Sequence, residues 1–278
     1  MTTESTESPE QTPININHNR TATVNPLMLK TKMPGVTVKL PSGGLLYGTR
    51  GELDRKVKHG ELHVYPMTAM HEIILKSPDK MLSGDSLREV FAHCIPEITN
   101  IDEICTKDID YLMLILRKVS YGDNLTITYT HDCHEKKKHE YVVDLNVLVA
   151  QSKSIDPITM ASRFMITLPN DQVIQFSPLR YRDAIELMQS TDAEDDKSNV
   201  HALFGVILSL IVDVDGITDK SMILEWLGAL PVAYITIVLK EVEKVSSWGP
   251  DYKYDVKCVD CAETLQLNVP INPSSFFM

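Results

Sequence analysis

The feature that most constrains the fold is the order of the sequence patterns, because the second half of the chain repeats the order of the first. Each half opens with two short alternating strands near a Leu-Pro turn, at 37–43 and at 165–171. Each half then continues into apolar segments of helical period and closes on a strand pair whose connection contains cysteine. We therefore predict an α+β fold made by internal duplication, with a first repeat over residues 35–150 and a second over 160–278. Two unrelated α+β halves that share general patterns are the alternative.

Local periodicity predicts where individual helices and strands lie. Residues 124–130 and 140–145 alternate between apolar and polar positions, as strands do. One helix is expected to have Ser83 or Asp85 as its N-cap, and another is expected to follow Thr106. Their apolar faces comprise Leu87, Val90, Phe91 and Cys94 in the first helix, and Ile109, Leu112, Met113 and Leu116 in the second.

The closest local match between the halves lies where each half is expected to enter its helices. At one constant offset, Pro66, Ile73 and Leu75 correspond to Pro178, Ile185 and Leu187. The second half has a longer helical region within 188–240, and Asp215-Gly216 is expected to be a turn between helices. The spacing around Asp213 does not fit a calcium-binding EF-hand loop.

Charge and hydropathy exclude some classes of function. The chain has 27 Lys and Arg against 38 Asp and Glu, a net charge of −11, whereas general binding to nucleic acid or anionic membranes needs a cationic surface. The longest apolar stretches, 203–208 and 226–239, are too short to span a bilayer and are predicted to be buried helices. Residues 1–25 have almost nothing to bury and are predicted to form a disordered tail. They contain no apolar run typical of a signal peptide, so we expect a cytoplasmic origin.

The clearest chemical signal is the pair Cys258 and Cys261, because a C-x₂-C turn is the usual half of a tetrahedral zinc site. The corresponding turn of the first half contains Cys133, with three histidines close to it. A structural zinc site could therefore join the halves through Cys133, Cys258, Cys261 and one of three histidines: His131, His134 or His139. An ordinary reduced C-x₂-C turn beside a solvated His- and Lys-rich turn is the alternative. Cys94 and Cys105 lie in apolar helical patterns and are expected to be core residues.

The C-terminus ends in the apolar residues Phe276, Phe277 and Met278. A free tail rarely ends so, and we expect Phe276 and Phe277 to bind a partner subunit or to pack on the chain's own core. No nucleophile, general base or phosphate-binding motif stands out from the sequence, so we do not expect an enzyme.

Two segments together carry a resemblance to a known family: LPSGGLLYG at 40–48 and HVYPMTAMHEIIL at 63–75, followed by the paired cysteine-bearing hairpins. From about residue 35 to its C-terminus the chain resembles the baseplate hub subunit family of T4-like contractile-tailed bacteriophages, the product of T4 gene twenty-six and its relatives. The resemblance implies a structural or assembly component of the tail baseplate, assembled in the host cytoplasm, whose partners are other hub and tail proteins. Zinc-knuckle cysteines of relatives would map onto Cys133, Cys258 and Cys261, and Thr130 stands where a fourth cysteine is expected.

Two other classes of function remain as alternatives. A zinc-ribbon module that binds nucleic acid would need a basic face, and the densest basic run is Lys136-Lys137-Lys138. A zinc enzyme would need a general base beside the metal, and the sequence does not identify one.

Overall fold

The computed structural model describes residues 33–48, 50–130, 138–156, 164–191, 198–271 and 276–277. The predicted N-terminal tail lies outside these residues. By its contacts the chain divides into residues 1–33 and a compact unit of residues 34–278, which contains all the helices and strands described below. The two predicted repeats therefore do not form separate compact units.

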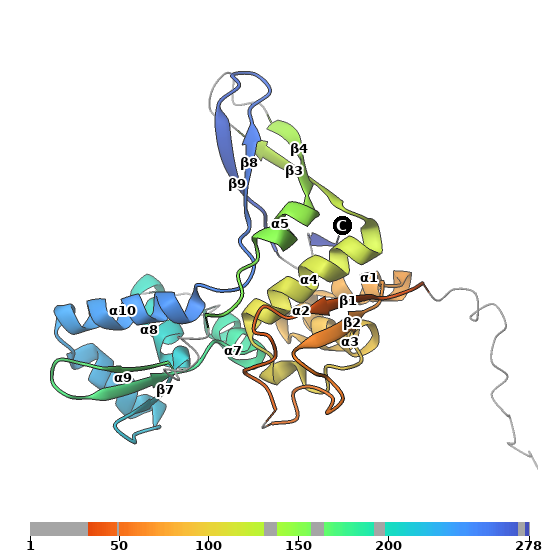
Figure 1. The fold of residues 1–278 in the computed structure, drawn as a ribbon. Helices are drawn as coiled ribbons and strands as arrows, with labels where there is room; N and C mark the ends of the chain where they lie inside the picture. Colours follow the sequence, from red (N-terminus) through yellow and green to blue (C-terminus); the bar gives the residue numbers. More distant parts are fainter. Residues whose placement is uncertain are drawn as a thin grey trace, which may run out of the picture. The chain divides into compact units, whose positions relative to one another are not determined.

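The first half contains two antiparallel strand pairs with helices between them (Figure 1). The first pair is β1 (Val36–Lys39) with β2 (Glu61–Val64), and the second is β3 (Asn124–Thr130) with β4 (Lys138–Asp144). The helices are α1 (Ala69–Leu75), α2 (Pro78–Leu82), α3 (Asp85–Cys94), the 3₁₀ helix η2 (Ile101–Glu103), α4 (Thr106–Tyr121) and, after β4, α5 (Leu145–Gln151).

The second half has the same order with one strand added. It begins with β5 (Met165–Thr167) and β6 (Val173–Phe176) and ends with β8 (Lys253–Lys257) and β9 (Thr264–Asn268). Between them lie α7 (Tyr181–Thr191), α8 (Ser198–Leu210), β7 (Ile211–Val214), α9 (Lys220–Ala229) and α10 (Val232–Ser246). The α+β class is thus confirmed, and the repeated order is visible, while descent from a duplication stays a prediction.

Strand β7 corrects one expectation. The predicted long helical region is interrupted because Ile211–Val214 pairs with β6 and completes a three-stranded antiparallel sheet. Asp215 and Gly216 therefore form a turn after a strand, and both have positive φ angles. Pairing with a strand far away in sequence outweighs the apolar, helix-like surroundings of this segment.

The N-cap of α3 also differs from the prediction. It is Gly84, with φ of 77°, and not Ser83 or Asp85. A Cβ at this glycine would come within 2.8 Å of Ile185 in α7, and the Gly84 carbonyl accepts a hydrogen bond from the Tyr181 hydroxyl. A close approach between the halves therefore decides this position.

Two main cores hold the unit together. The first lies among β2, α3, α4 and α5, and it also includes Tyr181, Ile185 and Val269 from the second half. The second lies among the three-stranded sheet, α8, α9 and α10, and it includes Cys105 from the first half. All eight predicted face residues of α3 and α4 are buried in the first core. The matched pair Ile73 and Ile185 differs, however, since Ile73 is 64% exposed and Ile185 only 8%.

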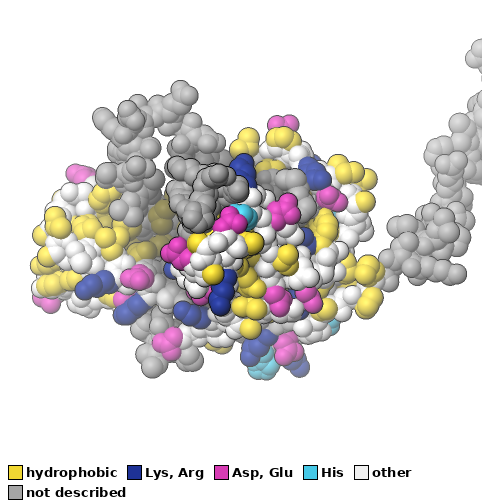
Figure 2. All heavy atoms as spheres, turned by 90° about the horizontal axis from the view of Figure 1, so that it is seen from above, with side chains coloured by type: hydrophobic (Ala, Val, Ile, Leu, Met, Phe, Trp, Pro, Cys, Tyr) yellow, Lys and Arg dark blue, Asp and Glu magenta, His cyan; other side chains and the backbone are white. Residues whose placement is uncertain are grey.

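The apolar stretches 203–208 and 226–239 are helical, but the second is divided at Pro231. It is also only partly buried: Leu227 and Val238 lie in the second core, while Val232 is exposed. Hydrophobic side chains accordingly gather at the left of Figure 2, where Figure 1 places α10. Among the described residues, none of the helices has the length and apolar character needed to cross a bilayer.

Candidate functional site

The two cysteine-bearing hairpins, β3–β4 and β8–β9, lie side by side (Figure 1). Tyr141 of the first hairpin packs in one cluster with Cys258, Leu265 and Leu267 of the second. Near their connecting turns, Nε2 of His139 lies 2.9 Å from Oδ2 of Asp260. Asp260 stands between the two cysteines of the C-x₂-C turn, so that turn lies close to the end of β4.

Of the predicted zinc ligands, Cys258 and Cys261 are described, whereas His131 and Cys133 lie outside the described residues, as does His134. Cys258 is buried and Cys261 is exposed at the surface. The turn is tight: the Cys258 amide donates to the Glu263 carbonyl at 2.8 Å, and the Ala262 amide donates to the Cys258 carbonyl at 3.0 Å. Ala262 takes a positive φ of 59° to close the turn.

The described residues supply two thiols at knuckle spacing, and no cluster of three metal-ligating side chains is found among them. His139 is engaged with Asp260 through Nε2. A four-ligand site would take Cys133 and one of His131, His134 or His139 as its remaining ligands. The zinc site therefore stays a prediction, which the packing of the two hairpins favours.

The structure places Phe276 and Phe277 in the first core of the chain itself. Both side chains are buried, and their rings meet edge to face with centroids 5.4 Å apart. Of the two expected roles, packing on the chain's own core is the one seen. The structure therefore does not support the expected binding of a partner subunit by these two rings, because a side chain buried in a core is not accessible to another subunit.

Arg117 of α4 holds this C-terminal segment in place. Its Nε donates a 2.9 Å hydrogen bond to the Phe276 carbonyl, and its guanidinium lies 4.3 Å from the ring centroid of Tyr121. Burial lowers the pKa of Arg117, against the opposing charge interaction with Tyr121. No local sequence pattern indicates this arginine, because its partner is a backbone carbonyl 159 positions away.

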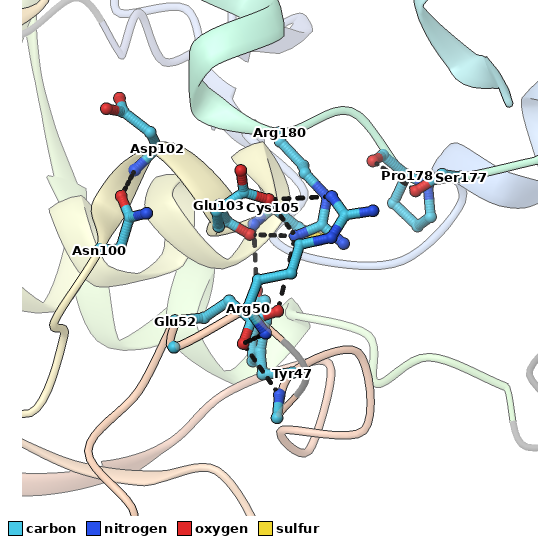
Figure 3. Close-up of polar contacts among 12 residues, drawn as sticks. Tyr47, Arg50, Glu52, Asn100, Asp102, Glu103, Cys105, Ser177, Pro178 and Arg180 are labelled. Atoms are coloured by element: carbon cyan, nitrogen blue, oxygen red, sulfur yellow. Dashed lines mark hydrogen bonds and ion pairs between the residues drawn. The ribbon is translucent and has the colours of Figure 1, made fainter.

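A buried polar network joins the two halves, and it was also missed by sequence analysis (Figure 3). Arg180, just before α7, donates from Nη1 to the Glu103 carbonyl at 2.5 Å, and the same nitrogen lies 3.3 Å from Oε2 of Glu103. Nη1 of Arg50 lies 3.0 Å from that carboxylate oxygen. Arg182 forms a further ion pair with Glu103. One carboxylate thus receives three guanidinium groups from two distant parts of the chain.

Glu52 adds a second carboxylate to this network. Its Oε2 accepts hydrogen bonds from the amides of Gly48 and Arg50, both at 3.0 Å, and its Oε1 lies 4.0 Å from Nη1 of Arg180. Burial alone would raise the pKa of Glu52, but the backbone amides and the charge of Arg180 outweigh it and lower that pKa. Glu52 therefore serves as an ionised anchor for its own loop.

Asp108 of α4 anchors the Leu-Pro-Ser-Gly-Gly turn. It accepts hydrogen bonds from the Ser42 amide at 3.1 Å and from the Tyr47 hydroxyl at 2.5 Å. Burial raises the pKa of Asp108 to about 6, although these hydrogen bonds oppose the shift. The turn itself needs glycine, because a Cβ at Gly44, which has φ of 74°, would lie 2.8 Å from the Gly60 amide nitrogen.

The buried thiols of Cys94 and Cys105 are poorly suited to act as nucleophiles. Burial raises the pKa of both Cys94 and Cys105 to about 12, so both are protonated near neutral pH. Both are core residues, as predicted. The charged groups of the network contact one another and anchor the backbone.

Comparison with known proteins bears on the first half of the chain. No curated protein and no solved structure matches the sequence. Residues 33–159 match a protein family described as T4 bacteriophage base plate protein. This region includes the Leu-Pro-Ser-Gly-Gly turn, α3, α4 and the β3–β4 hairpin. The match makes this region of the chain similar to T4-like baseplate proteins, and it does not single out a hub subunit.

Proposed function

We propose that the chain is a non-enzymatic structural or assembly component of a phage baseplate hub and acts through contacts with other hub and tail proteins. The observation that carries this proposal is the match of residues 33–159 to the baseplate protein family. The hub assignment is finer than that match and rests on the resemblance of the segments at 40–48 and 63–75.

The structure supports a role in binding rather than catalysis. Its buried charges anchor loops and join the two halves, which gives other subunits a well-defined surface to bind. Exposed apolar side chains lie on α9 and α10, and acidic and basic side chains are interspersed on the face drawn in Figure 2. Such a mixed surface favours specific protein contacts over general phosphate binding.

The proposal is tested by removing the gene from a phage that encodes the chain and supplying it from a plasmid. We expect loss of complete baseplates without the gene, restoration with it, and detection of the chain by mass spectrometry in purified tails or in hub intermediates. Normal baseplates in its absence, or its absence from both tails and intermediates, would contradict the proposal.

We also propose that a structural zinc ion links the two hairpins. Its ligands would be Cys133, Cys258, Cys261 and a histidine of the first turn, with His131 as the first candidate. Zinc would supply coordination bonds that tie β8–β9 to β3–β4, as tetrahedral zinc does in small knuckles. The contact between His139 and Asp260 supports this proposal, since it brings the C-x₂-C turn close to the end of β4.

A further inference from the structure

Strand β1 has an edge that could accept another strand. It pairs only with β2 among the described strands. The Leu40 amide donates to the Gly60 carbonyl at 2.9 Å, which shows that the even-numbered residues point their backbone groups toward β2. The amides and carbonyls of Thr37 and Lys39 therefore point away from β2, toward the open edge.

The apolar face of this strand pair is fully covered by the rest of the chain along β2 and only partly covered along β1. Val36 lies opposite Val64, and Val38 lies opposite Leu62, so these four side chains share a face. Leu62 and Val64 are fully buried, whereas Val36 is 40% exposed. The inner face of β1 is therefore only partly covered by the chain itself.

A groove continues from this exposed part of the face. It has a volume of about 570 Å³ and is lined by β1 together with Tyr111, Ile115 and Val119 of α4 and Val149 of α5. A third strand added beside β1 would direct every second side chain into this groove, because side chains alternate between the two faces of a sheet. The groove and the open strand edge are thus suited to the same extended occupant.

The charges at the rim of the groove indicate which segments would fit. Lys39 is exposed on β1, and Lys118 lines the groove with its Nζ 3.8 Å from Asp123. Two lysines and one aspartate thus line the groove, and Glu61 of β2 lies opposite Lys39 on the other side of that lysine from the open edge. An acidic residue on the added strand would be favoured beside Lys39, since opposite charges on neighbouring strands attract.

We propose that the open edge of β1 binds an extended segment of another baseplate protein as a third strand. Apolar residues of that segment enter the groove at every second position, and an acidic residue faces Lys39. This inference rests on the proposed function and specifies the surface through which it acts. A helical partner would leave the backbone groups of Thr37 and Lys39 without strand partners, and a second copy of this chain would bring further lysines to the same rim.

Two substitutions test the edge in the plasmid complementation assay. Val36→Asp places a charge in the groove, and Thr37→Pro removes an outward amide that an added strand would use; proline is tolerated at such an edge position. The matched control is Val142→Asp, because Val142 is also an exposed strand valine, 58% exposed on β4. Thermal unfolding of each purified variant establishes that it folds.

We expect Val36→Asp and Thr37→Pro to lower incorporation into tails or hub intermediates at least tenfold, and Val142→Asp to leave it unchanged. Lys39→Glu should lower it several-fold, whereas the control Lys257→Glu on β8 should not. Hydrogen exchange supplies a readout without substitution: the outward amides of Thr37 and Lys39 should exchange more slowly in the isolated assembly than in the free chain.

The outcomes separate this inference from the function on which it rests. If the wild-type chain is absent from tails and intermediates, the proposed function fails. If the wild-type chain is present but Val36→Asp and Thr37→Pro are incorporated normally, strand addition is overturned and the baseplate role stands. A free chain that is dimeric, and that Val36→Asp converts to a monomer, would assign the edge to a second copy and overturn the partner proposed here.

Discussion

Two buried carboxyl groups hold neighbouring parts of the loop after β1, and their surroundings differ. Asp108 anchors the loop at Ser42 and Tyr47 and has no cation among these partners, so burial raises its pKa. Glu52 receives backbone amides and lies near Arg180, and its pKa is lowered. Burial acts in the same direction on both groups, so the nearby donors and cations decide the difference.

The buried carboxyl group of Asp108 should make the stability of the chain fall as pH rises. Its pKa is about 6 in the folded chain, against an ordinary value of 3.8 for an aspartate side chain. Between these values the folded state binds more protons than the unfolded state, so the free energy of unfolding falls as pH rises. We expect the ionisation of Asp108 to lower the free energy of unfolding by up to about 3 kcal/mol as pH rises.

Urea unfolding at a series of pH values from 4 to 7, for the wild type and Asp108→Asn, measures the contribution. The variant should lose less stability over this range, because Asn does not ionise. Asp110, whose pKa burial also raises to about 6, is present in both proteins and cancels in the comparison. Parallel curves for the two proteins would contradict the assignment.

Removal of the Phe277 ring should strongly lower the stability of the isolated chain. Phe277→Ala removes a ring that is buried in the first core, and we expect a loss of about 3–5 kcal/mol. Val232→Ala is the control, since Val232 is 82% exposed and its loss should change stability by less than about 0.5 kcal/mol. Equal stability of the two variants in chemical denaturation would show that the C-terminal rings are not core residues in solution.

At the scale of elements, the two hairpins form a small structure of their own. β3–β4 and β8–β9 come from different halves of the sequence, yet they share a cluster that includes Tyr141 and Leu267. The Tyr254 hydroxyl of β8 accepts a hydrogen bond from the Asp144 amide at the end of β4. A contact near the turns, between His139 and Asp260, completes the pairing.

Zinc content tests whether a metal strengthens this pairing. Protein purified without chelators should carry about one zinc ion per chain by elemental analysis. Cys261→Ser and Cys133→Ser should both lose the metal and stability, and binding should weaken at acid pH because thiolates must be deprotonated. Cys94→Ser is the control that keeps zinc. Full zinc retention in Cys133→Ser would exclude a site that joins the hairpins.

At the scale of the whole unit, the two cores meet along a short seam between the halves. The Thr106 amide donates to the Leu179 carbonyl, and the Tyr181 amide donates to the Ile104 carbonyl, both at 2.9 Å. Arg180 lies within this seam and reaches Glu103. Since these are bonds between the halves, the first and second cores should unfold together.

Substitution of Arg180 should therefore weaken the coupling between the first and second cores. Arg180→Met leaves the carboxylates of Glu52 and Glu103 buried with less compensating charge, and we expect a loss of about 3–5 kcal/mol. The matched control is Arg182→Met, because Arg182 binds the same Glu103 from a more exposed position and should cost about 1 kcal/mol or less.

Urea unfolding followed by far-ultraviolet circular dichroism measures both variants. In Arg180→Met the single transition should weaken or separate into two, because the variant loosens the seam between the cores. Similar stability losses for the two variants would contradict a special role for the buried arginine.

The sequence by itself determined the α+β class and most of the elements whose periodicity is local. The strand predicted at 124–130 is β3, and the predicted apolar faces of α3 and α4 are the buried ones. Hydrophobic period and secondary structure are linked within a few residues, so such features can be read from a single sequence. The conformation of the Leu-Pro-Ser-Gly-Gly turn is local as well, since glycine allows its positive φ angles.

Only the tertiary structure decided how these elements combine. It made Ile211–Val214 a strand, placed Phe276 and Phe277 in the first core, and brought Arg180 to Glu103. Each of these outcomes depends on a partner far away in the sequence, and no local pattern specifies which partner that is. Burial and pairing free energies are gained only when such distant groups meet, so the folded chain selects among alternatives that the sequence pattern leaves equal.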